Sequence, residues 1–217
     1  MEFFLLDVTA MLLFAVKWVI YILAFLLLLL GLDDFFIDAA YWSRRFYRKL
    51  FVYSNFPKAD ENILFTVPEK PLAVMIPAWN EVDVIGKMAD LAARTLDYEN
   101  YQIFVGTYPN DPDTQRDVDE VCQRFTNVHK IVCARPGPTS KADCLNNIID
   151  AIFSFEKAGG IEFAGFILHD SEDVVSPLEL RLFNYLLPRK DLIQVPVYPF
   201  LPHWYEFTGG HYVDEFS

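Results

Sequence analysis

The sequence is poor in cysteine, and no two of its cysteines are spaced for metal binding. The three are Cys122, Cys133 and Cys144, whereas zinc sites that can be recognised from sequence are built on close pairs such as C-x-x-C. They fall on an expected helix, an expected strand and a second expected helix. This distribution argues against a zinc site and is typical of free thiols in a reducing cytoplasm.

Glycine-rich phosphate-binding loops are absent as well. Neither G-x-G-x-x-G nor G-x-x-x-x-G-K-[ST] occurs in the sequence, so neither a dinucleotide-binding site nor a P-loop is supported. Positive charge is scarce: the formal net charge is −12 at pH 7. This argues against a nucleic acid as partner, because nucleic-acid binding requires a basic face. A phosphorylated ligand would have to be held through a metal ion.

A long apolar run is present near the N-terminus. Residues 11–30 carry Lys17 as their only charge, and at about 1.5 Å per residue they are long enough to cross a hydrocarbon layer of about 30 Å. A cleaved signal peptide is disfavoured by the length of the run and by Glu2 and Asp7 before it. The sequence therefore predicts a transmembrane anchor over residues 1–32.

Basic residues follow the apolar run and none precedes it. Arg44, Arg45, Arg48 and Lys49 come after the run, which predicts that the C-terminal part is cytoplasmic. Aromatic residues are interleaved with these cations, so residues 33–56 are expected to form an amphipathic helix in the headgroup region of a lipid bilayer. The alternative is a core helix of the soluble part.

From residue 71 onward, short apolar runs alternate with stretches of helical periodicity. This pattern predicts an α/β fold over residues 57–217, with a mainly parallel sheet flanked by helices. In such sheets, ligands bind beyond the carboxyl ends of the strands. The expected strands are residues 72–76, 101–107, 127–134 and 163–170, with a further apolar stretch at 192–200.

Three carboxylates follow the expected fourth strand, in "HDSEDVVSP". One interpretation is a solvated loop that opens the next helix, with Ser176 as N-cap and Glu179 as capping-box acid. That interpretation leaves Asp170, Glu172 and Asp173 unexplained. Asp170 and Glu172 are two positions apart at a strand end and can share Mg²⁺ or Mn²⁺, whose remaining positions would take phosphate oxygens.

Three segments carry a family resemblance. "VMIPAWNE", "TSKADCLN" and "ILHDSEDVVSP" occur in this order and resemble the inverting family-two glycosyltransferases, which have the GT-A fold. The resemblance implies a nucleoside diphosphate sugar as donor, of the UDP type, a growing surface polysaccharide as acceptor, and a divalent metal ion. It implies the following site residues: Pro77, Ala78, Asn80 and Glu81 at the uridine, Asp111 or Asp113 as the acid near the base or ribose, Lys141 at the phosphates, and Asp170 and Glu172 at the metal.

The apolar N-terminus and the C-terminal stretch of residues 195–216 together resemble inner-membrane members of this family in bacteria. This resemblance implies a plasma-membrane location and allows an outer-membrane export partner. The family's general base and its Q-x-x-R-W segment are not recognisable, and Asp214 and Glu215 are not assigned as that base. We therefore expect an incomplete donor-binding domain that transfers no sugar by itself.

Two other functions fit parts of the pattern. Asp170, Glu172 and Val174 imitate the D-x-D-x-[TV] motif of aspartyl-phosphate phosphatases, in which the first aspartate is a nucleophile. However, glutamate would replace the general acid, and that motif normally closes the first strand of its domain. The third possibility is a glycosyltransferase-like scaffold or receptor component without turnover.

Overall fold

A computed structural model describes residues 2–55 and 60–196 of the chain, with side chains described from Thr9 onward. The chain divides into two compact units, Met1–Ala59 and Asp60–Ser217. Part of the expected stretch at 192–200, together with Asp214 and Glu215, lies outside the described residues, and residues 192–196 form no strand.

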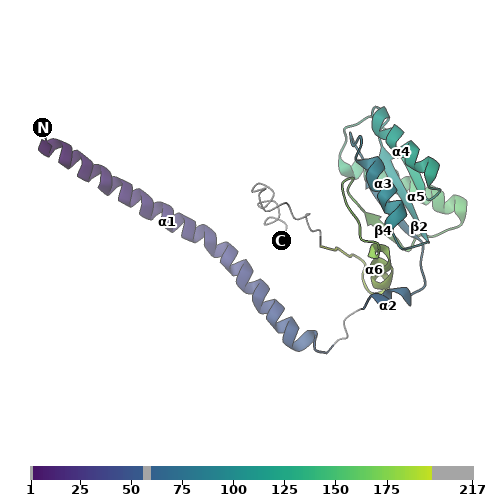
Figure 1. Ribbon diagram of the computed structural model, residues 1–217, viewed down its shortest axis with the longest axis horizontal. Helices are drawn as coiled ribbons and strands as arrows, with labels where there is room; N and C mark the ends of the chain where they lie inside the picture. The colour runs from purple at the N-terminus through teal and green to yellow at the C-terminus, as the bar shows by residue number, and fades with distance from the viewer. Residues whose placement is uncertain (1, 56–59, 197–217) are drawn as a thin grey trace. The chain divides into compact units, whose positions relative to one another are not determined.

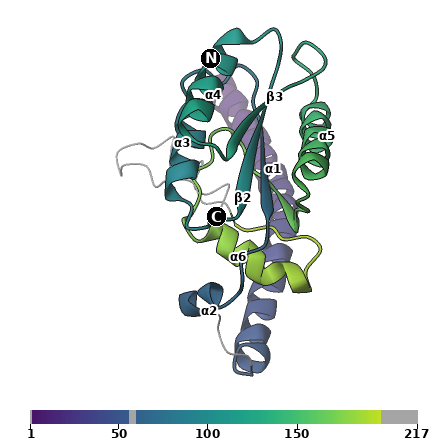
Figure 2. The same ribbon diagram turned by 90° about the vertical axis from the view of Figure 1, so that its right-hand side faces the viewer.

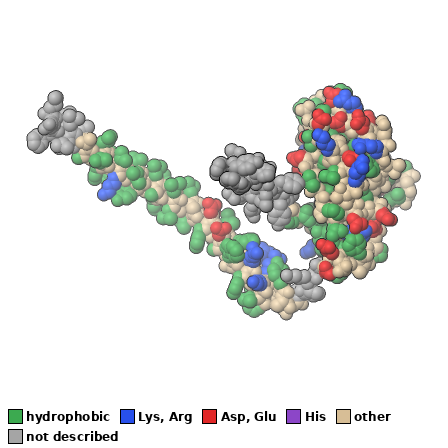
Figure 3. Space-filling model, in the orientation of Figure 1, with side chains coloured by type: hydrophobic (Ala, Val, Ile, Leu, Met, Phe, Trp, Pro, Cys, Tyr) green, Lys and Arg blue, Asp and Glu red, His purple; other side chains and the backbone are tan. Residues whose placement is uncertain are grey.

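The N-terminal unit is one long helix, α1 (Glu2–Tyr47), which continues into a short π-helix, η1 (Arg48–Val52). No proline interrupts it, and Gly31 is its only glycine. By length and composition, the helix within Thr9–Val52 is able to cross a membrane: an 18-residue window of it has a mean hydropathy of 2.6, and none of that window is buried. Figure 3 shows hydrophobic side chains along this helix and a group of Lys and Arg side chains towards its C-terminal end.

The second unit is built on a four-stranded sheet in which every neighbouring pair is parallel. The strand order is β3-β2-β1-β4, and Figure 1 shows the sheet among its helices. The expected α/β fold with a parallel sheet is confirmed. The third and fourth strands are shorter than their apolar runs. The strands are β1 (Leu72–Pro77), β2 (Tyr101–Thr107), β3 (Val128–Val132) and β4 (Gly165–Leu168).

Helices cover both faces of this sheet. Figure 2 shows α3 (Ile85–Thr95) and α4 (Pro112–Arg124) on one side and α5 (Lys141–Gly159) on the other. Alternate residues of β1 enter opposite cores: Leu72 packs with α3, α4 and α6 (Glu179–Leu186), whereas Ala73 packs with α5. Two short helices, α2 (Glu61–Phe65) and η2 (Leu187–Arg189), complete the unit.

Gly106 lets α5 lie directly on the sheet. A Cβ atom at this position of β2 would lie 2.6 Å from Cys144 Sγ and 2.7 Å from Ile148 Cδ1, both on α5. Any larger residue would therefore push against the helix. Because α5 begins at Lys141, this close packing sets the position of its N-terminus at the carboxyl end of the sheet.

The expected capping box before α6 is wrong. The N-cap of α6 is Leu178, with no side-chain cap hydrogen bond, and Ser176 is exposed. Glu179 Oε1 instead lies 3.3 Å from Nε2 of His169, which is only 4% exposed. The carboxylate that the local pattern assigned to the helix end instead contacts His169, the residue directly after β4.

Replacing Glu179 by alanine is expected to lower the free energy of unfolding by about 1–3 kcal/mol, because the buried imidazole of His169 would lose its hydrogen-bond partner. Urea denaturation measures the change. Ser176→Ala is the matched control and should change stability by less than about 0.5 kcal/mol, because an exposed side chain away from such features contributes little. Equal losses of stability in the two variants would contradict this result and support the capping-box interpretation.

Candidate functional site

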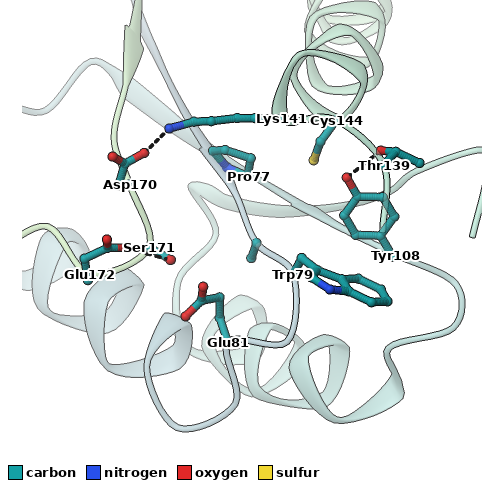
Figure 4. A pocket seen from close by; sticks show the side chains of 11 residues that line it. Pro77, Trp79, Glu81, Tyr108, Thr139, Lys141, Cys144, Asp170, Ser171 and Glu172 are labelled. Atoms are coloured by element: carbon teal, nitrogen blue, oxygen red, sulfur yellow. Dashed lines mark hydrogen bonds and ion pairs between the residues drawn. The ribbon is translucent and has the colours of Figure 1, made fainter. Parts of the chain in front are cut away.

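A cavity of about 400 Å³ lies at the carboxyl ends of β1, β2 and β4, beside the first turn of α5. Its lining combines residues that the sequence predicted with others that it did not. The predicted ones are Pro77, Ala78, Glu81, Lys141, Asp170 and Glu172, and the others are Trp79, Tyr108, Thr139, Cys144 and Ser171. Figure 4 shows these side chains around the cavity.

The loop after β1 is held against the start of α4. Asn80 has a positive φ of 57°, and its N–H donates to Asp111 Oδ2 at 2.6 Å. The N–H of Glu81 donates to Thr114 Oγ1 at 3.1 Å. These bonds fix the backbone that presents Ala78 and Glu81 to the cavity.

Three of the predicted site residues lie outside the cavity lining. Asp111 is 7% exposed and caps α4, since its Oδ1 accepts from the N–H of Thr114 at 3.3 Å. Asp113 is exposed and pairs with Arg116 at 2.9 Å. Asn80 acts through its backbone N–H, which donates to Asp111. Asp111 therefore holds the loop after β1 against the start of α4.

Two aromatic residues form one wall of the cavity. The rings of Trp79 and Tyr108 meet edge to face, with centroids 5.0 Å apart, and the Tyr108 hydroxyl lies 2.8 Å from Thr139 Oγ1. Burial raises the pKa of Tyr108. A Cβ atom on Gly137 would come within 2.4 Å of the Trp79 ring. The absence of a side chain at Gly137 therefore allows the loop between β3 and α5 to pack on Trp79.

The charged residues form the opposite wall. Lys141 Nζ makes an ion pair with Asp170 Oδ1, and Ser171 Oγ donates to Glu172 Oε2 at 3.0 Å. The carboxylate of Asp173 instead accepts a hydrogen bond from the N–H of Asp170 at 2.8 Å. Of the three crowded acids, two therefore line the cavity and the third holds the turn.

The helix α5 begins with a side-chain cap. Ser140 is the N-cap, and its Oγ accepts from the N–H of Asp143 at 3.2 Å. The Asp143 carboxylate pairs with Arg135, which does not line the cavity. Arg135 is therefore a cation outside the cavity, paired with Asp143.

The donor atoms at the cavity suit an oxygen-preferring cation. Within residues 2–55 and 60–196, no group of three or more His, Cys, Asp and Glu side chains is arranged to hold a metal ion. Mg²⁺ commonly uses only one or two carboxylates and completes its shell with water and substrate phosphates. Asp170 and Glu172, on one wall of an open cavity, fit that kind of site.

Comparison with known proteins shows the following similarities. A profile described as Glycosyltransferase like family 2 matches residues 68–201. Bacteriophage adsorption protein B of Escherichia coli K12 is 66% identical over 213 residues, covering 98% of this chain and 29% of the relative. Bacteriophage N4 adsorption protein B of Escherichia coli O157:H7 has the same identity and coverage. The chain thus spans about 29% of the length of the curated relatives it matches.

Among solved structures, glucosyl-3-phosphoglycerate synthase from Mycobacterium tuberculosis in complex with uridine diphosphate is 16% identical. It aligns over 61% of this chain and 46% of that chain, with a TM-score of 0.41. A second structure, of a mycobacterial protein, is 17% identical over 63% of this chain and 43% of that chain, with the same TM-score.

Proposed function

Because the chain belongs to the glycosyltransferase-like family 2, we propose that its cavity binds a nucleoside diphosphate sugar of the UDP type together with Mg²⁺ or Mn²⁺. The chain is then the donor-binding part of a membrane-anchored, inverting glycosyltransferase that extends a surface polysaccharide. The observation that carries the proposal is the meeting of an aromatic wall, a lysine and two carboxylates in one cavity.

Each wall of the cavity suits one part of such a donor. Trp79 and Tyr108 offer faces and edges for a base, and aromatic contacts of this kind contribute about 1–3 kcal/mol per base. Lys141 supplies donors for phosphate oxygens. Asp170 and Glu172 would hold the cation, which when bound neutralises charge on the departing diphosphate.

A cation is also needed on electrostatic grounds. A diphosphate next to the carboxylates of Asp170 and Glu172 would face a repulsion of about 4 kcal/mol per anion pair at 4 Å and an effective dielectric of 20. Lys141 offsets only part of that repulsion, because it is already paired with Asp170. Binding of UDP should therefore depend on the metal.

Calorimetry of the detergent-solubilised chain with UDP, in Mn²⁺ and in EDTA, tests the proposal. We expect measurable binding only with the metal, and weaker binding of ADP. Absence of UDP binding under both conditions would contradict the proposal and favour a scaffold that keeps the fold without turnover. Hydrolysis of p-nitrophenyl phosphate would instead favour the phosphatase function.

The membrane part of the proposal rests on the N-terminal unit. At about 100° per residue, the four cations at residues 44, 45, 48 and 49 fall within an arc of about 140° on the helix. Phe35 and Phe46 fall outside this arc. An apolar helix followed by such a basic and aromatic segment suits a span with its cationic end in the cytoplasmic headgroup layer. For a bacterial chain, this is the inner membrane.

Alkaline phosphatase fused after Ser217 is expected to be inactive in bacterial cells, because the cations after the span keep the C-terminal part in the cytoplasm. Green fluorescent protein fused at the same residue should fluoresce. Replacing Arg44, Arg45, Arg48 and Lys49 by glutamine should raise phosphatase activity. High activity in the unchanged chain would show the opposite orientation, away from cytoplasmic sugar nucleotides.

A further inference from the structure

Lys141 and Asp170 meet on one wall of the cavity, from two different parts of the chain. Lys141 is the first residue of α5, and Asp170 follows β4. Each side chain is 50% exposed, and both line the cavity. Figure 4 shows the lysine side chain reaching towards the aspartate. Their ion pair is therefore open to any ligand that enters.

Lys141 is the side chain that pairs with the Asp170 carboxylate in the described part of the chain. The other polar contacts of Asp170 are made by its backbone: its N–H donates to Asp173 Oδ2, and its carbonyl accepts from the N–H of Asp173. A metal ion that takes Asp170 Oδ1 must therefore displace the ammonium group. A metal ion on the other oxygen, Oδ2, would lie close to the ammonium group, and the two positive charges would repel each other.

The lysine can move without any change in the fold. Ser140 caps α5 through the N–H of Asp143, which fixes the backbone at Lys141. The lysine side chain has a flexible four-carbon stem and three donors. Turning away from Asp170 needs only rotation about these bonds, into the cavity where a diphosphate would lie.

We propose that Lys141 is an exchangeable partner that couples metal binding to nucleotide binding. It holds Asp170 when neither ligand is present, and it transfers to the diphosphate when a metal ion takes the carboxylate. Metal alone then binds weakly, because it must break the ion pair with no phosphate to receive the lysine. Metal and nucleotide together bind cooperatively, and the coupling is reciprocal. This inference rests on the proposed function.

The test compares Lys141→Gln with the unchanged chain in two titrations. Mn²⁺ is first titrated alone, with the free ion followed by electron paramagnetic resonance, and UDP is then titrated at saturating Mn²⁺. Lys141→Gln should bind Mn²⁺ alone about two- to tenfold more tightly, since an exposed ion pair no longer competes. It should bind UDP about tenfold or more weakly, since a charge-assisted hydrogen bond is lost. Arg135→Gln, which removes a cation outside the cavity, should change neither affinity.

The two opposite changes distinguish the exchange from simpler roles. If Lys141→Gln weakens UDP binding and leaves the affinity for Mn²⁺ alone unchanged or lower, Lys141 is only a phosphate ligand and the exchange is wrong. If neither chain binds Mn²⁺ alone, the exchange is also wrong. If the unchanged chain binds Mn²⁺ but no UDP at all, the proposed function fails, whereas the comparison of Mn²⁺ affinities still supports or rejects the competition at Asp170.

Discussion

Asp170→Asn is expected to abolish the effect of Mn²⁺ on UDP binding. In the unchanged chain, Mn²⁺ should raise the affinity for UDP at least about tenfold, because it reverses the repulsion between the carboxylates and the diphosphate. The amide is neutral and is a much weaker ligand for Mg²⁺ or Mn²⁺. Calorimetry with UDP in Mn²⁺ and in EDTA compares binding under the two conditions. Glu172→Gln should act in the same direction.

Two controls separate metal binding from stability and from general charge. The Asp170 side chain is half exposed, so its replacement should move the melting temperature by only a few degrees. Asp113→Asn removes one negative charge from the exposed surface of α4, outside the cavity, and should leave the metal effect intact. A metal effect that survives in Asp170→Asn would place the cation elsewhere.

Gly106→Val is expected to lower the free energy of unfolding by about 3 kcal/mol or more. Its Cβ alone would lie within 3 Å of Cys144 Sγ and Ile148 Cδ1, and both of those residues are buried. The added methyl groups would force α5 away from β2. Because α5 carries Lys141, UDP affinity should fall in any protein that remains folded. Chemical denaturation monitored by circular dichroism measures the stability.

Gly159→Ala is the matched control on the same helix. A Cβ atom there would lie 3.6 Å from Ile161 Cδ1, an ordinary contact, and alanine favours the helix more than glycine does. Stability should stay equal or rise by up to about 1 kcal/mol. If Gly106→Val were as stable as this control, α5 would not be packed against β2 in the way described.

The fold was predictable because its determinants are local along the chain. Continuous apolar runs such as residues 72–76 and 101–107 form strands buried on both faces, and the helices between them require parallel crossovers. The Ser140 cap of α5 was predictable for the same reason, since donor and acceptor are three residues apart. Asp170 and Lys141 lie at the carboxyl end of the sheet because each follows a strand and all the strands run in the same direction.

The roles of individual side chains were less predictable because they depend on contacts between distant residues. Asp111 was predicted near the nucleotide, but it accepts from Asn80, 31 positions earlier. Glu179 matched a capping box, yet its carboxylate lies beside the buried His169. Tyr108 was not predicted as a site residue, although it comes directly after β2. No sequence pattern distinguishes an aromatic residue at a strand end that lines a cavity from one that packs in the core.

The sequence by itself thus determined the apolar N-terminal helix, the parallel α/β fold and the acidic strand end, because hydrophobic spacing and chain order carry that information. Only the tertiary structure decided which acids face the cavity. Asp170 and Glu172 line it, while Asp173 and Asp111 hold turns. The physical reason is that a carboxylate's role depends on which donors the fold brings within hydrogen-bond distance, and those donors come from other elements of the sheet and its helices.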